Sequence, residues 1–270
     1  MEALVTHFEV QMLDSRVSHL TPAYWHREGD RQPYGRVYYI KQGSGFIRTY
    51  GRRYELVPGR LYLIPPRGNL SYGCSENMQI WWMHFIATLF GGVDLFDYLP
   101  YRVERVPDDV RWVEQQMLRL LQARRGLLPA DQLEATGILI QLVAPFFRDL
   151  GETFHGEAHE EKRRFIPVLQ YIDANLGRSI SVAGLARIAN YEKSHFSTRF
   201  AALFGTPPMK YVNRKRIERV QLELQRPEAK LEALARQYGF HDAFHLSRTF
   251  KRLTGLSPRD FRKARREAHP

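Results

Sequence analysis

Two short runs of polar and basic side chains occur 50 residues apart near the end of the chain, at residues 194–199 and 244–248. Hydroxyl, imidazole and guanidinium groups hydrogen-bond to phosphate oxygens and to base edges, and arginine pairs bidentately with guanine. The side chains expected to point outward, toward double-stranded DNA, are Ser194, His195, Ser197, Thr198, Arg199, Phe244, His245, Ser247 and Arg248. The chemistry that these runs favour is recognition of a nucleic acid rather than catalysis.

The two runs belong to an internal repeat of about 80 residues. The tripeptide Leu185-Ala186-Arg187 recurs 49 residues later as Leu234-Ala235-Arg236. At an offset of 50, five further residues recur: His195, Phe200, Gly205, Pro208 and Tyr211 become His245, Phe250, Gly255, Pro258 and Phe261. Because the pattern repeats position by position, it indicates a duplicated structural unit and not merely a shared composition.

Each copy of the repeat predicts a helix, a tight turn and a second helix. Ser181 can cap the first helix of the first copy, and Asp242 can cap the second helix of the second copy. Asn190 and Gly239 follow the first helices, and both residue types tolerate the left-handed backbone that ends a helix. The inward residues of the second helices are Phe196 and Phe200, then Leu246 and Phe250. This is the helix-turn-helix arrangement, whose second helix fits the major groove.

The segment between the two copies and the distribution of charge agree with this interpretation. Residues 209–225 can form a helix of about 25 Å, and such a spacer would set the two second helices about one DNA turn, 34 Å, apart. Residues 151–270 hold 23 Lys and Arg against 13 Asp and Glu, whereas residues 1–150 hold 17 against 16. The asymmetry indicates an anionic partner for the second half alone. The alternative is a duplicated helical bundle that binds no nucleic acid.

Residues 1–95 have a different pattern, with short β-rich runs separated by glycine and proline. The runs cover residues 38–40, 45–50, 53–56, 60–64 and 79–85. Their spacing predicts a sandwich or barrel. Two helices are expected at 106–125 and 130–150, with Pro145 kinking the second, and they either cover their own domain or form a dimer interface. The polar segment 151–164 is predicted to be a linker.

The second half carries a set of residues known from one protein family. They are Leu185-Ala186, Phe196-Ser197, Phe200, Gly205, Pro208, Arg216-Ile217, Leu231, Leu234-Ala235, Gly239-Phe240, Asp242, Leu246-Ser247-Arg248, Phe250-Lys251 and Gly255-Leu256-Ser257-Pro258. With them the second half resembles the AraC/XylS family of bacterial transcriptional regulators, although Glu192 and Lys193 depart from its common Ser-Pro helix start. The resemblance implies seven helices with two helix-turn-helix units, and a homodimer on DNA. It leaves open a contact with RNA polymerase.

The first half resembles the small cupin barrel of the sugar-sensing members of that family, in residues 43–45, 54–56, 58–66 and 82–85. The resemblance places Trp82 at a stacking position, Tyr72 on the wall and Lys41 at a polar position of an effector site. Lys41 stands where the sugar-sensing members have an arginine, and Ser71 stands where they commonly have a histidine. We therefore expect the ligand of this protein to differ from theirs. His84 joins the candidates if the strand alternates, although the pattern favours a core or rim histidine over a ligand. The effector would be a small molecule, with sugars as one candidate class.

Catalysis, metal binding and membrane insertion find no support in the sequence. The scattered histidines contain no His-x-His pair near the strands, so no metal is expected. Cys74 is the one cysteine and lacks the Pro-Cys-His-Arg context of a reactive thiol, and no Gly-x-Ser-x-Gly or phosphate-binding glycine loop occurs. No apolar run reaches the roughly 18 residues of a membrane span, and the first residues lack a secretory signal. We expect no catalytic residue, no cofactor, no membrane contact and a cytoplasmic location.

These observations together predict an α+β protein. Residues 1–150 would form a cupin-like β-barrel with two flanking helices, for effector binding and dimerisation, and residues 151–164 a linker. Residues 165–270 would form an all-α domain with two helix-turn-helix units. The expected function is a sequence-specific DNA-binding transcriptional regulator controlled by a small-molecule effector. The alternatives are a cupin-type enzyme tethered to nucleic acid and an effector-independent DNA-binding activator.

Overall fold

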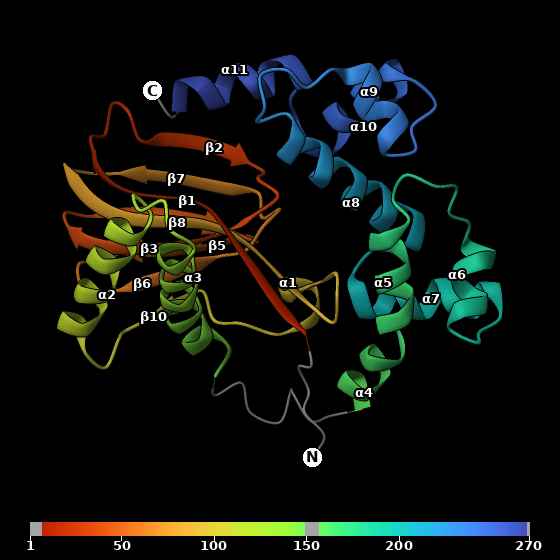
Figure 1. Ribbon diagram of the computed structural model, residues 1–270, viewed down its shortest axis with the longest axis horizontal. Helices are drawn as coiled ribbons and strands as arrows, with labels where there is room; N and C mark the ends of the chain where they lie inside the picture. Colours follow the sequence, from red (N-terminus) through yellow and green to blue (C-terminus); the bar gives the residue numbers. More distant parts are fainter. Residues whose placement is uncertain (1–6, 149–156, 269–270) are drawn as a thin grey trace. The chain divides into compact units, whose positions relative to one another are not determined.

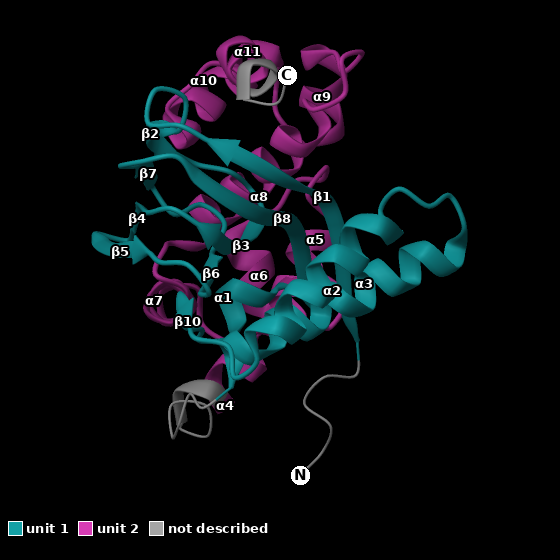
Figure 2. Cartoon of the chain, turned by 90° about the vertical axis from the view of Figure 1, so that its left-hand side faces the viewer, with its two compact units in different colours: residues 1–89, 94–154 teal, residues 90–93, 155–270 magenta. Residues whose placement is uncertain are grey.

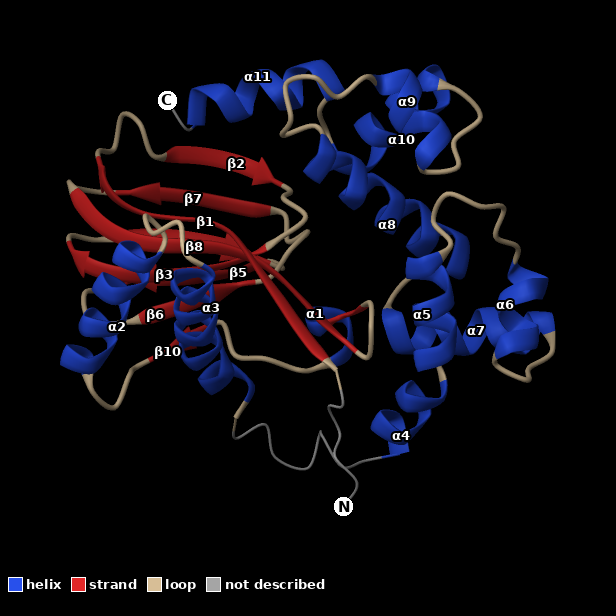
Figure 3. Cartoon of the chain, viewed as in Figure 1, coloured by secondary structure: helices blue, strands red, loops and turns tan. Residues whose placement is uncertain are grey.

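The computed structural model describes residues 7–148 and 157–268 and divides the chain into two compact units. The first unit holds residues 1–89 and 94–154, and the second holds residues 90–93 and 155–270 (Figure 2). The first is built mainly of strands, with a few helices, and the second of helices (Figure 1, Figure 3). The expected α+β fold class is confirmed.

Ten strands are present in the described part of the chain. They are β1 (Phe8–Leu20), β2 (His26–Asp30), β3 (Gly35–Gln42), β4 (Gly45–Thr49), β5 (Arg52–Leu56), β6 (Leu61–Ile64), β7 (Leu70–Cys74), β8 (Met78–Leu89), β9 (Val93–Asp94) and β10 (Glu104–Arg105). One sheet has the order β1-β8-β3-β6-β10 with β9 also on β8, and the other has the order β2-β7-β4-β5. Neighbouring strands in both sheets run antiparallel, as the short connections between them predict.

The two sheets pack face to face but do not join into a closed barrel, which corrects one detail of the sequence-based expectation. The larger sheet ends at β1 and β10, and the smaller at β2 and β5. Closure needs continuous pairing around the whole ring, and the two-residue β10 cannot supply it at one edge. Tyr38 and Trp82 from the larger sheet share one apolar core with Ile47 and Leu70 from the smaller sheet.

Alternation along β3 decides which side chains enter that core. Tyr38 and Ile40 belong to the core between the sheets. Tyr39 points to the other face, where its hydroxyl donates to Glu114 Oε1 of α2 (Val110–Ala123) at 2.6 Å. Because successive strand side chains point to opposite faces, every second residue of β3 faces α2 instead of the interior.

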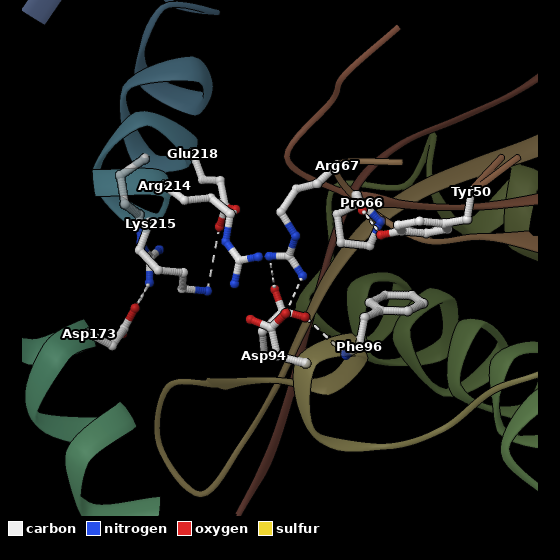
Figure 4. Close-up of polar contacts among 11 residues, drawn as sticks. Tyr50, Pro66, Arg67, Asp94, Phe96, Asp173, Arg214, Lys215 and Glu218 are labelled. Atoms are coloured by element: carbon white, nitrogen blue, oxygen red, sulfur yellow. Dashed lines mark hydrogen bonds and ion pairs between the residues drawn. The ribbon is translucent and has the colours of Figure 1, made fainter. Parts of the chain in front are cut away.

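An arginine in a turn fixes the start of the short helix α1 (Leu95–Tyr98) in the first unit (Figure 4). Arg67 adopts a left-handed backbone with φ of 66°. Its two terminal nitrogens reach Asp94 Oδ2 at 3.0 Å and Asp97 Oδ1 at 2.9 Å. Asp94 also caps α1, since its Oδ1 accepts the Phe96 N–H at 2.9 Å. The turn before β7 is thereby tied to the segment that follows β9.

The two helices expected after the strands are present but shorter than predicted. Helix α2 starts at Val110, where Asp109 caps it by accepting the Trp112 N–H at 3.0 Å. Helix α3 (Pro129–Val143) gives way to the 3-10 turn η1 (Ala144–Phe147), which contains Pro145. The disruption predicted at this proline is confirmed, because its ring and missing N–H are incompatible with a continuing α-helix.

The second unit contains eight α-helices in the described residues. They are α4 (Glu157–Arg164), α5 (Ile166–Ala174), α6 (Val182–Ile188), α7 (Lys193–Phe204), α8 (Pro208–Glu223), α9 (Leu231–Gln237), α10 (Ala243–Thr254) and α11 (Pro258–Ala268). Seven of them, α5 to α11, lie within residues 165–270, as the family resemblance implied. The expected linker 151–164 is helical from Glu157 onward, because a charged segment forms a helix as readily as a coil, and residues 151–156 lie outside the described residues.

Candidate functional site

The first helix-turn-helix unit consists of α6, a turn at residues 189–192 and α7. Ser181 caps α6 as predicted, since its Oγ accepts the backbone N–H three residues later at 3.1 Å. Asn190 is left-handed, with φ of 56°. The next N–H, of Tyr191, donates to the Ala186 carbonyl at 3.0 Å and closes the turn. Glu192 begins α7 without a side-chain cap, where the sequence departs from the family pattern.

The second unit, of α9, a turn and α10, repeats this geometry. Gly239 is left-handed with φ of 66°, and the Phe240 N–H donates to the Ala235 carbonyl at 2.9 Å. Asp242 caps α10 as predicted, because its Oδ1 accepts the His245 N–H at 2.7 Å. That hydrogen bond lowers the pKa of the Asp242 carboxyl. The two turns therefore close with equivalent backbone bonds, and only the second recognition helix has a side-chain cap.

In each unit, an equivalent pair of aromatic rings packs against the buried face of the second helix. Phe200 and Tyr211 lie 5.4 Å apart between ring centroids, with an interplanar angle of 82°. Phe250 and Phe261, exactly one repeat later, lie 5.5 Å apart at 76°. Such edge-to-face packing is a favoured arrangement of aromatic side chains. Each unit thus buries one face of its second helix in the same way and leaves the opposite face to solvent.

Arg216 of α8 links the two copies through three backbone carbonyls. Its Nε donates to Leu176 O at 2.9 Å, one terminal nitrogen to Gly239 O at 3.1 Å and the other to Arg178 O at 2.7 Å. The side chain is buried, and burial lowers its pKa. The sequence pattern included Arg216 but assigned it no role. Its role is to fix the turn of the second unit to the segment that precedes the first.

The predicted contact residues lie on the outer face of α7 and α10. Exposed side chains are Ser194, His195, Thr198, Phe244, His245 and Arg248, and half-buried ones are Ser197, Arg199 and Ser247. The inward residues Phe196 and Leu246 are fully buried, as the spacing predicted. The structure therefore exposes Ser194, His195 and Thr198 on α7 and Phe244, His245 and Arg248 on α10, and it leaves the three half-buried residues at the margins of these exposed faces.

The two histidines of these runs also pack against the turns. The His195 ring lies 5.0 Å from the Tyr191 ring, and the His245 ring lies 5.4 Å from the Phe240 ring, both edge-on. In addition, the His241 N–H donates to His245 Nδ1 at 3.5 Å. These contacts give both histidines a supporting role at the base of each recognition helix, beside the exposed edge that faces solvent.

Two hydroxyls of α7 are engaged with the helix itself. Ser197 donates to the Lys193 carbonyl at 2.9 Å, and Thr198 donates to the Ser194 carbonyl at 3.2 Å. Such bonds to the carbonyl four residues back are common for serine and threonine in helices. While they hold, each hydroxyl oxygen faces outward as an acceptor, which suits the amino groups of adenine and cytosine in the major groove.

Arg199 is held by an acidic partner. Its Nε donates to Glu161 Oε1 at 2.5 Å, and a terminal nitrogen contacts the other carboxylate oxygen. This hydrogen bond lowers the pKa of Glu161 and raises the pKa of Arg199. The arginine predicted to contact DNA is therefore bound to α4. To reach a phosphate it has to leave this carboxylate or share it.

Arg248 has a different environment from Arg199. Its guanidinium carbon lies 5.7 Å from the centroid of the Phe244 ring, one helical turn earlier. Both side chains are exposed on the same face of α10. A guanidinium presented at the surface in this way is available for the bidentate pairing that specifies guanine.

Three of the four predicted effector residues lie together between the sheets of the first unit. Trp82 belongs to the core, and its indole N–H donates to Ser18 Oγ of β1 at 2.9 Å. The Trp82 and His84 rings lie 4.4 Å apart, and His84 stacks on Tyr34 at 4.6 Å. The predicted alternation of β8, with Trp82 and His84 on one face, is confirmed by these contacts.

Tyr72 enters the same interior from the smaller sheet. Its ring lies 4.7 Å from that of Trp25, which in turn lies 6.3 Å from the ring of Tyr38. Burial and the nearby charge of Asp30 raise the pKa of the Tyr72 hydroxyl, so it remains a neutral hydrogen-bonding group. An aromatic layer from both sheets therefore surrounds the predicted stacking position.

Lys41 lies on the opposite face of β3 from this layer. Its Nζ donates to Glu114 Oε1 of α2 at 2.7 Å, beside Tyr39, and the two hydrogen bonds lower the pKa of Glu114. Because the strand alternates, residue 41 shares its face with 39 and not with Tyr38. The structure thus does not bring Lys41 together with the other predicted effector residues.

A buried ion pair that sequence reasoning missed supplies the polar end of the interior. Arg36 Nη2 lies 2.5 Å from Asp30 Oδ2, and both side chains are 6 % exposed. Gln32 donates to Asp30 Oδ1 at 2.9 Å, and Arg36 lies near the Tyr38 hydroxyl at 3.5 Å. Burial is the largest influence on the pKa of Asp30 and raises it, but the charges of Arg36 and Arg27 and the hydrogen bonds from Gln32 and Arg36 together outweigh burial, so the pKa is lowered. Strand alternation could have identified Arg36 from the sequence, because it lies two residues before Tyr38 and therefore on the same face of β3.

Metal-ligating side chains, the cysteine thiol and helix length are the remaining features of the described residues. Among the described residues, no group of three or more His, Cys, Asp or Glu side chains is placed to hold a metal ion. Burial raises the pKa of the Cys74 thiol, which disfavours the reactive thiolate. Of the helices within residues 7–148 and 157–268, none is long and apolar enough to cross a membrane.

Comparison with known proteins gives matches over both units. Residues 16–143 match the model of the AraC-like ligand binding domain, and residues 185–264 match that of a helix-turn-helix domain. The raffinose operon regulatory protein RafR of Pediococcus pentosaceus is 23% identical over 247 residues, 84% of this chain and 84% of that protein. The arabinose operon regulatory protein of Escherichia coli K12 is 24% identical over 238 residues, 82% of this chain and 77% of that protein.

Solved structures show the same fold over most of the chain. ToxT from Vibrio cholerae superposes with a TM-score of 0.56 at 12% identity, covering 94% of this chain and 98% of that one. The duplicated helix-turn-helix units, the strand-rich first unit and the two matched domain models agree on one assignment. The chain belongs to the AraC/XylS family of transcriptional regulators.

Proposed function

We propose that this DNA-binding regulator acts as a homodimer whose helices α7 and α10 both enter the major groove. The observation that carries the proposal is the equal construction of the two units: the same turn, the same aromatic pair and one arginine, Arg216, between them. Helix α8 has 16 residues and spans about 24 Å, so it holds the two recognition helices at a fixed separation. Two rigidly linked helices favour two major-groove segments on one face of the DNA.

The outer face of α2 and α3 supports dimerisation. Several large apolar side chains there are exposed: Trp112 and Leu118 on α2, Leu127 and Leu128 in the loop, and Leu133 on α3. Several large apolar side chains exposed on one pair of helices favour a protein–protein interface there. A second copy of the same face is its proposed occupant. Sedimentation of the full chain, with and without Leu133→Glu, tests this, and a monomeric wild type would contradict it.

The effector is proposed to bind between the sheets, against Trp82 and Tyr72 and beside the Asp30–Arg36 pair. Aromatic faces with a few oriented polar groups are the usual lining of small-molecule sites. A carboxylate and a guanidinium at one end suit a ligand with several hydroxyls, such as a sugar. The names of the relatives RafR and the arabinose regulator favour sugars. ToxT has been solved with a substituted butenoic acid, so unsaturated acids belong in the same ligand panel.

The remaining parts of the proposal concern partners and place. A regulator of this family acts on DNA, which supports a cytoplasmic location, and its role at operons is the ground for proposing a contact with RNA polymerase. No reaction is proposed, because the buried thiol and the engaged carboxylates of the described residues are placed for structure. A cupin-type enzyme would need a ligand set that the described histidines do not form.

The DNA part of the proposal is tested with the full chain and randomised duplexes. Wild-type protein is expected to select a defined site, and Arg248→Ala is expected to weaken binding by about 5- to 150-fold and to relax preference at one base position. The control is Arg187→Ala, which removes an exposed charge of α6, outside the recognition helices. It should weaken all sequences alike. If Arg248→Ala also weakens all sequences alike, Arg248 contacts only phosphate.

A further inference from the structure

Phe244 stands on the DNA-facing side of α10 without contributing to the core of its unit. Its side chain is 70% exposed, whereas Leu246 and Phe250 of the same helix are fully buried. A single exposed phenylalanine is unremarkable on an ordinary surface. On the outer face of a recognition helix, however, it is a large apolar group where the partner presents mainly hydrogen-bonding edges.

The internal repeat shows that the fold does not need an aromatic ring at this position. At the offset of 50, the first copy has Ser194 in place of Phe244 and Thr198 in place of Arg248. Both copies nevertheless form the same turn and the same edge-to-face core. The Phe244 and Arg248 pair is therefore a difference in surface chemistry between two otherwise equivalent helices.

The geometry of the pair places an apolar group and a guanidinium side by side. The Arg248 guanidinium carbon lies 5.7 Å from the Phe244 ring centroid, within the range of a cation–π contact. The two residues are four apart, so they lie about 6 Å from each other along the helix axis. Base pairs stack about 3.4 Å apart, and the two side chains therefore reach base pairs no more than two steps apart.

The chemistry of the major groove offers one apolar group on the base edges, the C5 methyl of thymine, and phenylalanine is among the side chains that contact it. Guanine offers the O6 and N7 acceptors that arginine pairs with. We propose that Phe244 is a specificity-determining residue that packs on a thymine methyl, next to a guanine read by Arg248. The inference rests on the proposed placement of α10 in the major groove.

The experiment uses the full-length protein and the site that it selects from randomised duplexes. Each thymine of that site is replaced in turn by uracil, which removes only the C5 methyl. One replacement, within two base pairs of the guanine that Arg248→Ala ceases to select, is expected to weaken binding about fourfold, the value of one buried methyl group. Phe244→Ser, which installs the residue of the first copy, should abolish this uracil effect, and Phe244→Leu should retain most of it.

Ser194→Ala is the matched control, because it alters the equivalent position of α7 and should leave the uracil effect unchanged. The exposed position of Phe244 predicts an unchanged melting temperature for Phe244→Ser. A wild type that selects no sequence would overturn the proposed function itself. A wild type that selects a site but shows no uracil effect, or a Phe244→Ser protein that keeps it, would overturn this inference alone. If Phe244→Ser selects the same site but no longer activates a reporter gene, the ring contacts a protein partner instead. That result would also overturn the inference.

Discussion

Arg216 and Gly239 are bound to each other across the repeat, with the arginine side chain donating to the glycine carbonyl at 3.1 Å. Gly239 has φ of +66°, and a Cβ added there would lie 2.8 Å from a terminal nitrogen of Arg216. The glycine is therefore required twice, for its left-handed backbone and for the close approach of the guanidinium. The first copy has Asn190 at the equivalent position, which is also left-handed, with φ of 56°.

Arg216→Ala is expected to destabilise the second unit by about 3 kcal/mol, because it leaves three buried or part-buried backbone carbonyls without their charged donor. Arg216→Lys should recover only part of this, since one ammonium group cannot reproduce the planar fork. All four tryptophans lie in the first unit, so tryptophan fluorescence does not report on the second unit. The suitable measurement is therefore hydrogen exchange of the backbone amides of α8 and α10. Exchange as slow as in the wild type would contradict the assigned role.

The Asp30–Arg36 pair predicts acid sensitivity of the first unit. The native pKa of Asp30 lies below its ordinary value of 3.8, so the unfolded chain takes up the proton at a higher pH than the folded chain. The stabilising contribution is therefore complete above pH 3.8 and is lost as the pH falls through the native pKa. Tryptophan fluorescence during acid titration reports this transition in the first unit.

Asp30→Asn tests the same pair at neutral pH. Removing one member of a buried ion pair leaves the other charge uncompensated, and we expect a loss of about 3–5 kcal/mol in the first unit. The variant should also lose the part of the acid sensitivity that Asp30 contributes. Arg53→Ala removes a solvent-exposed ion pair with Glu55 and serves as the control, for which little loss of stability is expected. Equal stability of Asp30→Asn and wild type would contradict the assignment.

The ion pair of Arg199 with Glu161 predicts an unusual response of DNA binding to salt. Each phosphate neutralised contributes about −0.9 to the slope of log affinity against log salt. While Glu161 holds Arg199, the arginine adds little, so Arg199→Ala should leave the slope nearly unchanged. Glu161→Gln should release the guanidinium and steepen the slope by about 0.9, and the double variant should return to the original value. If Arg199→Ala alone makes the dependence of log affinity on log salt clearly shallower, Arg199 neutralises a phosphate in the wild type. That result would show that DNA displaces Glu161 from the arginine.

The sequence predicted the second unit almost residue by residue, and the reason is that its signals are local. Caps at Ser181 and Asp242, left-handed turns at Asn190 and Gly239, and helical spacing each depend on a few neighbouring residues. The partner of Arg199 was beyond reach because Glu161 is 38 residues away, in a segment taken for a linker.

The first unit was harder to predict because its strands depend on long-range pairing. Strand β1 pairs with β8 along its whole length, but the apolar alternation with which it begins, at Phe8, Val10 and Met12, is broken by the register shift between Met12 and Asp14. Strands β2 and β7 were missed for a similar reason, since Gly29 and Gly73 lower their β-propensity. The separation of Lys41 from the other effector candidates has another origin. The family resemblance placed Lys41 near the effector site. It did not show the parity along β3, that is, whether the odd-numbered or the even-numbered residues face the core.

That parity gives the last prediction, which separates Lys41 from the other effector candidates. Trp82→Phe and Tyr72→Phe change groups at the core but keep an aromatic ring at each position. If the ligand packs on the indole and hydrogen-bonds to the hydroxyl, each variant should reduce the response of DNA binding to the effector by tenfold or more. A tenfold change corresponds to about 1.4 kcal/mol of binding free energy. Lys41→Met keeps the stem and removes the charge that contacts Glu114, outside that core. It should leave the response unchanged and lower only the stability, by about 1 kcal/mol or less.

The measurement is DNA binding by the full chain at increasing concentrations of each sugar and each unsaturated acid of the panel, with the melting temperature recorded in parallel. A ligand that raises the melting temperature of wild type and Lys41→Met alike, but not that of Trp82→Phe, binds in the interior between the sheets. The opposite result, a lost response in Lys41→Met with an intact one in Trp82→Phe and Tyr72→Phe, would move the effector site to the face of β3 that α2 covers. Because β3 and β8 are neighbours in one sheet, Lys41→Met and Trp82→Phe probe the two faces of that sheet and decide between them.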